Sequence, residues 1–367
     1  MSNITSIATA VPQYGQKQMQ IFEAVKNIHA DTEEEKRILK FMYRSSGIQK
    51  RYAAVPDFNI DNHTNEIITT NNGVYETLDL EHRLKIYDKA ALQLSREVIK
   101  KCLGAEALPS EITHLITVSC TGMQAPGLDL AIIRSLGLRT DIYRTSVNFM
   151  GCYAAIHGLK HAHYITAKEP DAKVLVVCVE LCTLHFQKEK TIDNITSTII
   201  FSDGAAAVLV EGSNSRKPGW LIKDFYSEIN FEGLEDMAWK IAADGFLMTL
   251  TGNVPGILEA QCDHIINNAL QHYKLQRNEV DAWCVHPGGR KILEAIQKGC
   301  GITRDQLAES YSVLSGYGNM SSPTVLFVLE KIINKARQHP EIKDIVGMAF
   351  GPGLTLETFH IAHARSF

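Results

Sequence analysis

The sequence predicts an α/β fold made of two copies of one unit. Strands alternate with helices in each half of the chain, and the same order of elements occurs twice. In the first half, the predicted elements are strand 114–120, a helix after Cys152, and strands 173–179 and 205–210. In the second half, they are strand 280–285, a helix after Asn319, and strands 345–350 and 354–361.

The spacing along the chain supports this duplication. Val118 precedes Cys152 by nearly the same number of residues as Trp283 precedes Asn319. Between the copies, residues 213–219 are polar and rich in turn-forming residue types. We therefore predict an N-terminal half, residues 1–212, and a C-terminal half, residues 213–367.

A helix is expected to cover the sheet of the first half. Tyr87, Ala91, Leu94 and Val98 follow one another at helical spacing and form an apolar stripe.

Composition limits the classes of function. With 367 residues, 45% of them hydrophobic, the chain can bury one large or two moderate cores. Its net charge of −4 gives no general attraction to nucleic acid or to anionic membranes. No apolar run approaches the ~20 residues of a membrane span, and residues 1–8 lack a basic start. We expect a cytoplasmic protein.

The cysteines and histidines do not indicate a metal site. Eight cysteines are few for a disulfide framework in a chain of this length, and none forms a Cys-x-x-Cys pair. His157 and His161 lie one helical turn apart, but no acidic residue accompanies them at Glu-x-x-His spacing. We predict no bound metal.

Cys152 has the features of a reactive thiol. It follows the turn-forming segment 148–151 and precedes a run of small residues that reads as a buried helix. Unpaired N–H groups and the positive end of the helix dipole would lower the pKa of a cysteine at this position. The sequence therefore predicts a thiolate.

His286 and Asn319 complete a candidate catalytic set. His286 ends an apolar strand that breaks into a glycine turn, and Asn319 stands at a loop-to-helix junction. Taken singly, a cysteine is usually a small buried hydrophobe, a histidine structural, and an asparagine a helix cap. All three lie at element ends, where active sites collect, and a Cys/His/Asn set is typical of acyl transfer.

These segments, in this order, resemble the type III polyketide synthases, the chalcone-synthase-like enzymes, of bacterial type. The resemblance extends over nearly the whole chain and includes residues 201–207, 253–256 and 347–358. Carrier-dependent ketosynthases share the catalytic set but lack the Phe-Gly-Pro-Gly turn at 350–353. The resemblance implies the five-layered αβαβα thiolase fold and a homodimer.

The resemblance also implies the reaction. Malonyl-CoA is condensed iteratively with an acyl-CoA starter that is held as a thioester on Cys152. His286, as imidazolium, would hold the thiolate before loading. Its ring N–H and the Asn319 amide would then stabilise the enolate left by decarboxylation, each donor contributing about 3 kcal/mol. CoA thioesters are substrates, and no further cofactor is expected.

Pocket and CoA residues follow from the same resemblance. Phe201 matches a gatekeeper phenylalanine; Met248 stands at the second gatekeeper position, with Phe246 on the same face of a strand. Other expected pocket residues are Cys120, Cys182, His185, Ala125, Ser321, Gly351, Pro352 and Gly353. Those expected at CoA are Arg37, Lys40 and Arg44, on one helix face, with Gly288 and Gly289. Alternatively, the gate residues are ordinary core residues. The alternative to CoA binding is that the basic residues on the helix form a charged face that contacts only water.

The pocket departs from the plant pattern. Cys120, Cys182 and His185 replace threonines, and Ala125 replaces a methionine that crosses the dimer interface. We therefore expect a fatty acyl or malonyl starter and an alkylpyrone, alkylresorcinol or polyhydroxylated aromatic product. A carrier-dependent 3-ketoacyl synthase, a chalcone- or stilbene-type synthase with an aromatic starter, and a non-catalytic acyl-binding protein are the alternatives.

Overall fold

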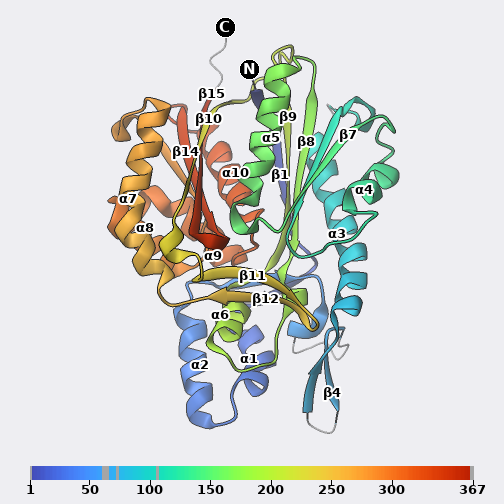
Figure 1. The fold of residues 1–367 in the computed structure, drawn as a ribbon, viewed down its shortest axis with the longest axis vertical. Helices are drawn as coiled ribbons and strands as arrows, with labels where there is room; N and C mark the ends of the chain where they lie inside the picture. The colour runs from blue at the N-terminus through green and yellow to red at the C-terminus, as the bar shows by residue number, and fades with distance from the viewer. Residues whose placement is uncertain (1, 60–65, 72–73, 105–106, 364–367) are drawn as a thin grey trace.

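Nine strands form one hydrogen-bonded sheet at the centre of the molecule (Figure 1). The computed structural model describes residues 2–59, 66–71, 74–104 and 107–363. From one edge of the sheet to the other, the strands are β13 (Ala282–Val285), β14 (Asp344–Gly351), β15 (Thr355–His363), β10 (Trp220–Ile229), β1 (Ser2–Ala10), β9 (Asp203–Glu211), β8 (Lys173–Leu181), β6 (His114–Ser119) and β7 (Tyr143–Asn148).

The sheet contains the predicted duplication. β6 runs parallel to β8, and β8 runs antiparallel to β9. β13, β14 and β15 repeat this pattern in the second half. β1 and β10 occupy equivalent places beside β9 and β15, and they pair with each other where the two halves meet. The α/β class and the two related halves are confirmed; the boundary at residue 212 stays a prediction.

Helices divide the molecule into five layers (Figure 1). The central layer holds α5 (Ala154–Lys168) and α10 (Thr324–Ala336), between the two halves of the sheet. The outer layers are α3 (Leu80–Leu103) with α4 (Leu128–Leu136), and α7 (Val254–Tyr273) with α8 (Arg290–Cys300). This is the αβαβα arrangement expected of the thiolase fold.

Burial on both faces explains the apolar strands. In β8, Val174 and Val176 pack in the core around the central helices, whereas Leu175 and Val177 belong to the outer core. Strands covered on both sides read as continuous hydrophobic runs. Gly158 lets α5 approach closely, because a Cβ there would lie 2.8 Å from Cγ1 of Val176.

The predicted covering helix is α3. Tyr87, Ala91, Leu94 and Val98 are all buried on it, and the Tyr87 hydroxyl donates to Ser119 Oγ at 2.7 Å. The Asp79 side chain caps its start by accepting from the N–H of His82.

Smaller elements close one end of the sheet (Figure 1). At this end, β7 finishes shortly before Cys152 and β13 finishes just before His286. The smaller elements are α1 (Gln18–His29), α2 (Glu33–Ser45), α6 (Ile192–Ile200), α9 (Ala308–Tyr317) and the hairpins β2–β3 (Tyr14–Lys17, Lys50–Ala53), β4–β5 (Ile68–Asn71, Val74–Thr77) and β11–β12 (Met237–Ala242, Gly245–Leu250). Among the residues described, no helix has the length and apolarity to cross a membrane.

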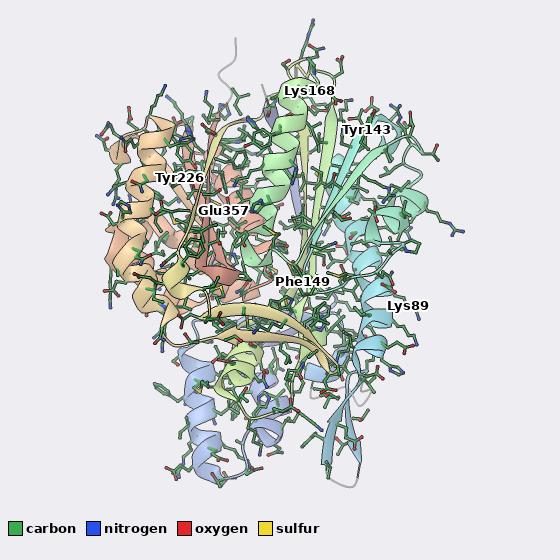
Figure 2. All side chains as sticks on the ribbon, viewed as in Figure 1. Lys89, Tyr143, Phe149, Lys168, Tyr226 and Glu357 are labelled. Atoms are coloured by element: carbon green, nitrogen blue, oxygen red, sulfur yellow. A yellow bond between two sulfur atoms is a disulfide. The ribbon has the colours of Figure 1, made fainter. Side chains whose placement is uncertain are left out.

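A buried carboxylate links the two halves beside α5. Glu357 of β15 contacts His157 Nε2 at 3.1 Å, accepts from Ser227 Oγ at 2.6 Å and pairs with Lys160 (Figure 2). Burial alone would raise the pKa of Glu357, but these contacts outweigh it and lower the pKa. The contacts hold the helix that follows Cys152 against the C-terminal strands.

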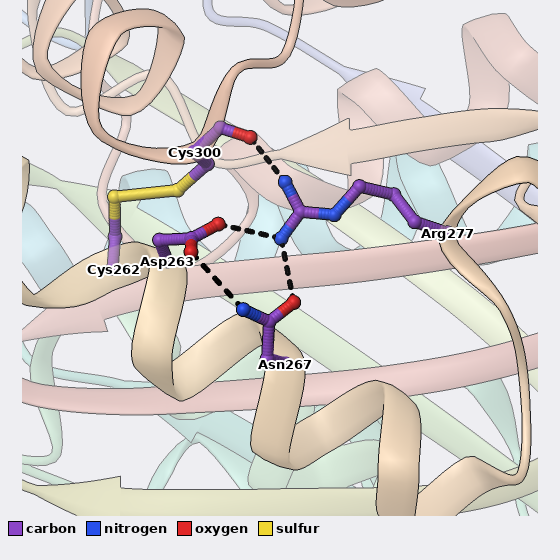
Figure 3. Close-up of a disulfide and its surroundings, with 5 residues drawn as sticks. All are labelled: Cys262, Asp263, Asn267, Arg277 and Cys300. Carbon is purple, nitrogen blue, oxygen red and sulfur yellow. Dashed lines mark hydrogen bonds and ion pairs between the residues drawn. A yellow bond between two sulfur atoms is a disulfide. The ribbon is translucent and has the colours of Figure 1, made fainter.

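A disulfide joins the two outer helices of the second half (Figure 3). It connects Cys262 of α7 with Cys300 at the end of α8, 38 residues apart. Beside it, Arg277 donates to the Cys300 carbonyl and pairs with Asp263 Oδ1 at 2.7 Å. The sequence spacing gave no sign of this pair, because only the packing of α7 on α8 brings the sulfurs together.

Removing the disulfide should destabilise the fold. We expect Cys300→Ser to lower the free energy of unfolding by about 2–4 kcal/mol, because the cross-link limits the freedom of the unfolded chain. Guanidinium denaturation with and without reductant measures this. Reductant should weaken the parent protein and leave Cys300→Ser unchanged; equal stability of both proteins without reductant would contradict the prediction.

Candidate active site

Four turns from both halves meet at the end of the sheet. They contain Cys152, His286, Asn319 and Pro352. Three non-glycine residues in these turns have left-handed φ angles: Phe149 at 57°, Ser321 at 55° and Leu354 at 45°. Such conformations cost free energy and concentrate at functional sites.

The turns touch one another directly. A Cβ on Gly151 would lie 2.1 Å from Cδ of Pro352, and a Cβ on Gly351 would lie 3.3 Å from the Cys152 nitrogen. Glycine is therefore required at Gly151 for this contact, and its φ of 79° also favours glycine. The predicted Phe-Gly-Pro-Gly turn packs against the turn of the nucleophile.

The structure brings the three predicted catalytic residues together. Cys152, His286 and Asn319 line one cavity of about 390 Å³, together with Gly288 and Ile292; we call it the catalytic cavity. Asn319 Nδ2 lies 4.0 Å from Cys152 Sγ and donates to the Gly288 carbonyl at 3.2 Å.

The orientation of the Asn319 amide is fixed by its neighbours. Its Oδ1 accepts from the Ser321 N–H at 2.8 Å, so Nδ2 is the atom that faces Cys152. The backbone of Asn319 is bridged to Phe201: its N–H donates to the Ile200 carbonyl, and its carbonyl accepts from the Ser202 N–H, both at 2.9 Å. The amide donor and the gate residue are thus parts of one rigid unit.

His286 is buried without a fixed partner for its ring. Its backbone N–H donates to the Met348 carbonyl at 2.9 Å, which anchors the residue to β14. Among the residues that the structure describes, neither ring nitrogen has a hydrogen-bond partner. Burial lowers the pKa of His286 to about 3, so the imidazole is neutral.

Burial opposes the predicted thiolate–imidazolium pair in this structure. Burial raises the pKa of Cys152 to about 11, and hydrogen bonds from Ser321 and Asn319 oppose this only in part. Cys152 lies in a 3₁₀ turn, Gly151–Tyr153, two residues before Ala154, where α5 begins. A helix dipole contributes about 0.3–1 kcal/mol, too little to offset burial. A neutral thiol and a neutral imidazole can instead exchange a proton during the reaction.

The protonation state can be tested by alkylation. The rate of Cys152 modification by iodoacetamide should rise about tenfold per pH unit between pH 6 and 9, because the thiolate fraction grows until the pKa is reached. Intact mass follows the reaction, with Cys152→Ala identifying any modification of other cysteines. A plateau below pH 7 would show that the resting site holds a thiolate.

Phe201 and Met248 stand where three cavities meet. Both line the catalytic cavity and an inner cavity of about 350 Å³ with Cys120, Cys152, Cys182, Ser321 and Pro352. Both also line a larger cavity of about 610 Å³, which extends past Cys182, His185 and Phe246 to Ser197 and Tyr14; we call it the apolar cavity. The two residues expected at the gate therefore occupy the junction.

The other predicted pocket residues differ in position. Cys120 Sγ accepts from the Gly151 N–H at 3.1 Å and lines the inner cavity, not the apolar one. His185 stacks on Phe246 with ring centroids 4.1 Å apart, its Nδ1 accepts from the Phe246 N–H at 3.1 Å, and its Nε2–H donates to the Thr121 carbonyl at 2.8 Å. Burial lowers the pKa of His185 to about 3, which leaves it a neutral wall residue.

Three predicted pocket residues do not line these cavities. Ala125 lies exposed on the loop after β6, where it precedes Pro126, and its expected contact across a dimer interface stays a prediction. Gly351 and Gly353 shape the turn at Pro352 instead, with a φ of 70° at Gly353.

Sequence reasoning missed two residues of the site. Trp239 of β11 donates from Nε1 to the Cys120 carbonyl at 2.8 Å and lines both the inner and the apolar cavity. Glu180 is fully buried; it accepts from the Cys120 N–H at 2.9 Å and from Ser322 Oγ at 2.8 Å, which links the two halves. Burial raises the pKa of Glu180 to about 7. The sequence signal for Glu180 was a single acidic residue within an apolar strand.

The predicted CoA residues lie on two elements, α2 and the turn before α8. Arg37, Lys40 and Arg44 are on α2, which begins with a capping box between Thr32 and Glu35. Just after α2, a Cβ on Gly47 would lie 3.3 Å from the Arg290 side chain, at the start of α8. Gly288 lines the cavity, and Gly289 caps α8. Among the described residues, no three histidine, cysteine or acidic side chains could together hold a metal ion.

This fold, with a buried Cys/His/Asn site between its halves, defines an acyl-condensing enzyme. The models of the chalcone and stilbene synthases match the chain with their N-terminal domain at residues 1–214 and their C-terminal domain at residues 228–364. The chain belongs to this family, the type III polyketide synthases.

Known relatives are similar along nearly the whole chain. An alpha-pyrone synthesis polyketide synthase-like protein, Pks18 of Mycobacterium tuberculosis, is 31% identical over 96% of this chain and 89% of its own. The 1,3,6,8-tetrahydroxynaphthalene synthase of Streptomyces peucetius is 27% identical over 97% and 92%. The crystal structure of PKS-I from the brown alga Ectocarpus siliculosus superposes with a TM-score of 0.91 at 31% identity, over 99% of this chain and 98% of that one.

Proposed function

We propose that this type III polyketide synthase extends a fatty acyl-CoA starter with malonyl-CoA and releases an alkylpyrone or alkylresorcinol, without a further cofactor. The observation that carries the proposal is the apolar cavity, which begins at the gate and continues beyond Cys182 between α6 and β3. Its walls are mainly apolar, as in most small-molecule sites. Similarity to a protein named for alpha-pyrone synthesis supports the same product class.

Loading begins with two neutral groups. As Cys152 Sγ attacks the thioester carbonyl of the starter, the thiol proton passes to His286, and the new sulfur–acyl bond forms while the bond to the CoA sulfur breaks. The proton then returns from His286 to the departing CoA thiolate. The low pKa of His286 suits this role, because the ring is free to accept a proton.

Extension needs a stabilised enolate. When malonyl-CoA loses CO2, negative charge develops on its thioester oxygen, and N–H donors of His286 and Asn319 can stabilise it. The enolate carbon then attacks the acyl group on Cys152, and the sulfur leaves. Fixed donors in a water-poor site stabilise such charge strongly, and the Asn319 amide is held in place by Ser321.

We also propose a homodimer formed through the β7 edge of the sheet. Among the strands that the structure describes, β7 pairs with β6 alone, and most of its residues are exposed. Tyr143 at this edge (Figure 2) and nearby Met123 and Leu130 are exposed apolar side chains. Unpaired edges and apolar patches favour association of two subunits. Sedimentation as a monomer at micromolar concentration would contradict the proposed homodimer.

The cytoplasmic location of the protein stays a prediction.

The two catalytic roles should separate by mutation. Asn319→Ala should slow malonyl-CoA decarboxylation about 100-fold or more, because one enolate donor is lost, while Cys152 alkylation stays near that of the parent protein. Cys152→Ala should abolish acyl loading and product but retain some decarboxylation. CO2 release and intact mass measure both effects. Unchanged CO2 release by Asn319→Ala would show that its amide is not an enolate donor.

Starter length should depend on the apolar cavity. Cys182→Phe, at the junction of the inner and apolar cavities, should restrict products to short acyl starters. Ser197→Phe, further along the same cavity, should exclude only the longest chains. Product masses from malonyl-CoA with acyl-CoAs of increasing length measure this. Identical profiles for all three proteins, or a preference for coumaroyl-CoA, would overturn the fatty-starter proposal.

A further inference from the structure

Helices α7 and α8 both begin at the wall of the catalytic cavity. α7 begins at Val254, shortly after Leu250, which lines the cavity. α8 begins at Arg290, and Gly288 and Ile292 on either side of it also line the cavity. A shift of α8 relative to α7 would therefore move the cavity wall.

The disulfide links these two helices at a place away from the cavity (Figure 3). Cys262 is in the third turn of α7, and Cys300 is the last residue of α8. With a rise of about 1.5 Å per residue, Cys300 lies roughly 15 Å along α8 from its start. The contact is close, because a Cβ on Gly299 would lie 2.3 Å from the Glu259 carbonyl oxygen. A change at this link can therefore tilt α8 as a rigid rod.

Without the disulfide, α8 would stay folded but would be held less firmly. Leu293 and Ile296 are fully buried and keep the helix on the core. Near Cys300 a polar link remains, because Arg277 donates to the Cys300 carbonyl and pairs with Asp263. The side chains of this ion pair are 37% and 49% exposed, so water screens their attraction. Breaking the sulfur–sulfur bond would therefore free the end of α8 without unfolding the helix.

In the described part of the chain, the disulfide is confined to this one pair of cysteines. The other six cysteines are free and buried. Cys300 is itself only 1% exposed, but it ends α8 directly before Gly301, and helix ends open readily. A reductant can therefore reach the Cys300 sulfur when the end of α8 opens. Disulfides in cytoplasmic proteins are typically redox-sensing, and we expect this protein to be cytoplasmic.

We propose that the Cys262–Cys300 pair is a redox switch that controls the affinity of the catalytic cavity for CoA esters. In the oxidised protein, the cross-link holds α8 so that Gly288 and Ile292 keep their places in the cavity wall. In the reduced protein, the end of α8 moves, and this wall must be ordered again when a CoA ester binds, which weakens binding. This inference rests on the proposed function and adds regulation to it.

The exchange is balanced by a dithiol reductant of the thioredoxin class. One thiolate of the reductant attacks the Cys300 sulfur, the bond to Cys262 breaks, and a mixed disulfide forms. The second thiolate of the reductant then attacks its partner sulfur in the mixed disulfide, and Cys300 leaves. Two electrons and two protons pass to Cys262 and Cys300, and the reductant becomes a disulfide. Oxidised glutathione reverses the reaction and is itself reduced to two thiols.

The test measures substrate affinity in both redox states. The protein is treated with dithiothreitol or with oxidised glutathione, the reagent is removed, and intact mass verifies the gain or loss of two hydrogens. Reduction should raise the KM for decanoyl-CoA about threefold or more and leave kcat within twofold, because binding is weakened and the reacting groups are unchanged. Reoxidation should restore the first KM.

Three variants sharpen the test. Cys300→Ser and Cys262→Ala break the link from either helix, and both should show the KM of the reduced parent protein in both states. Cys102→Ser is the matched control at a free cysteine of α3 that is 3% exposed, and it should switch as the parent protein does. Circular dichroism at the assay temperature verifies folding, and the reduced parent protein gives the measurement even if neither disulfide variant folds.

The remaining outcomes contradict the switch or the function separately. If the oxidised protein has eight free thiols by mass, or if KM is the same in both states, the switch is wrong and the proposed function stands. If reduction abolishes both kcat and the helical circular dichroism, the disulfide is only a structural cross-link and the switch is wrong. If decanoyl-CoA with malonyl-CoA gives no product in either state, the proposed function is wrong; the rate of Cys152 acylation by decanoyl-CoA, from intact mass, then still measures the switch.

Discussion

The contact between the turns of the two halves is the constraint on which this site depends. Pro352 occupies the space that a side chain at Gly151 would need, and Asn319 is bridged through its backbone to Phe201. The nucleophile and Phe201 come from the N-terminal half, whereas the histidine, the amide donor, Met248 and the Pro352 turn come from the C-terminal half. Small errors in how the halves pack would therefore separate the reacting groups. Glu180 and Glu357, each bonded across the halves, hold this packing on either side of Cys152.

Burial of the site determines its proton chemistry. Cys152 and His286 are both removed from water, which raises one pKa to about 11 and lowers the other to about 3. Forming a Cys152 thiolate and a His286 imidazolium in such surroundings would cost free energy before a substrate arrives. The same dryness strengthens the hydrogen bonds to an enolate once it forms. A neutral resting pair and a strong enolate site are thus two results of one environment.

The sequence predicted what depends on local pattern. The repeated strands, the stripe on α3 and the catalytic residues at element ends all reflect periodicity or turn chemistry, which neighbouring residues determine. The sequence could not show the burial that opposes the predicted thiolate, because a pKa depends on tertiary surroundings, and the Cys262–Cys300 pair was missed because it depends on helix packing. Trp239 was overlooked for the same reason: only the β11–β12 hairpin carries it over Cys120.

A set of buried hydrogen bonds holds Phe201 in position. Arg51 donates to the Phe201 carbonyl, Ser202 Oγ bonds both backbone groups of Tyr52, and Asp203 accepts from the N–H groups of Ala54 and Thr183 at 2.7 and 2.8 Å. Burial raises the pKa of Asp203 to about 6 despite these bonds. A buried acid is retained at such a cost only where its bonds are well satisfied. The Phe-Ser-Asp-Gly run therefore fixes Phe201 from three directions. Met248 faces it from the β11–β12 hairpin. This hairpin is held in turn by Trp239, which donates to the Cys120 carbonyl, and by the Phe246 N–H, which donates to His185 Nδ1, so both gate residues are positioned by bonds to the walls of the cavities.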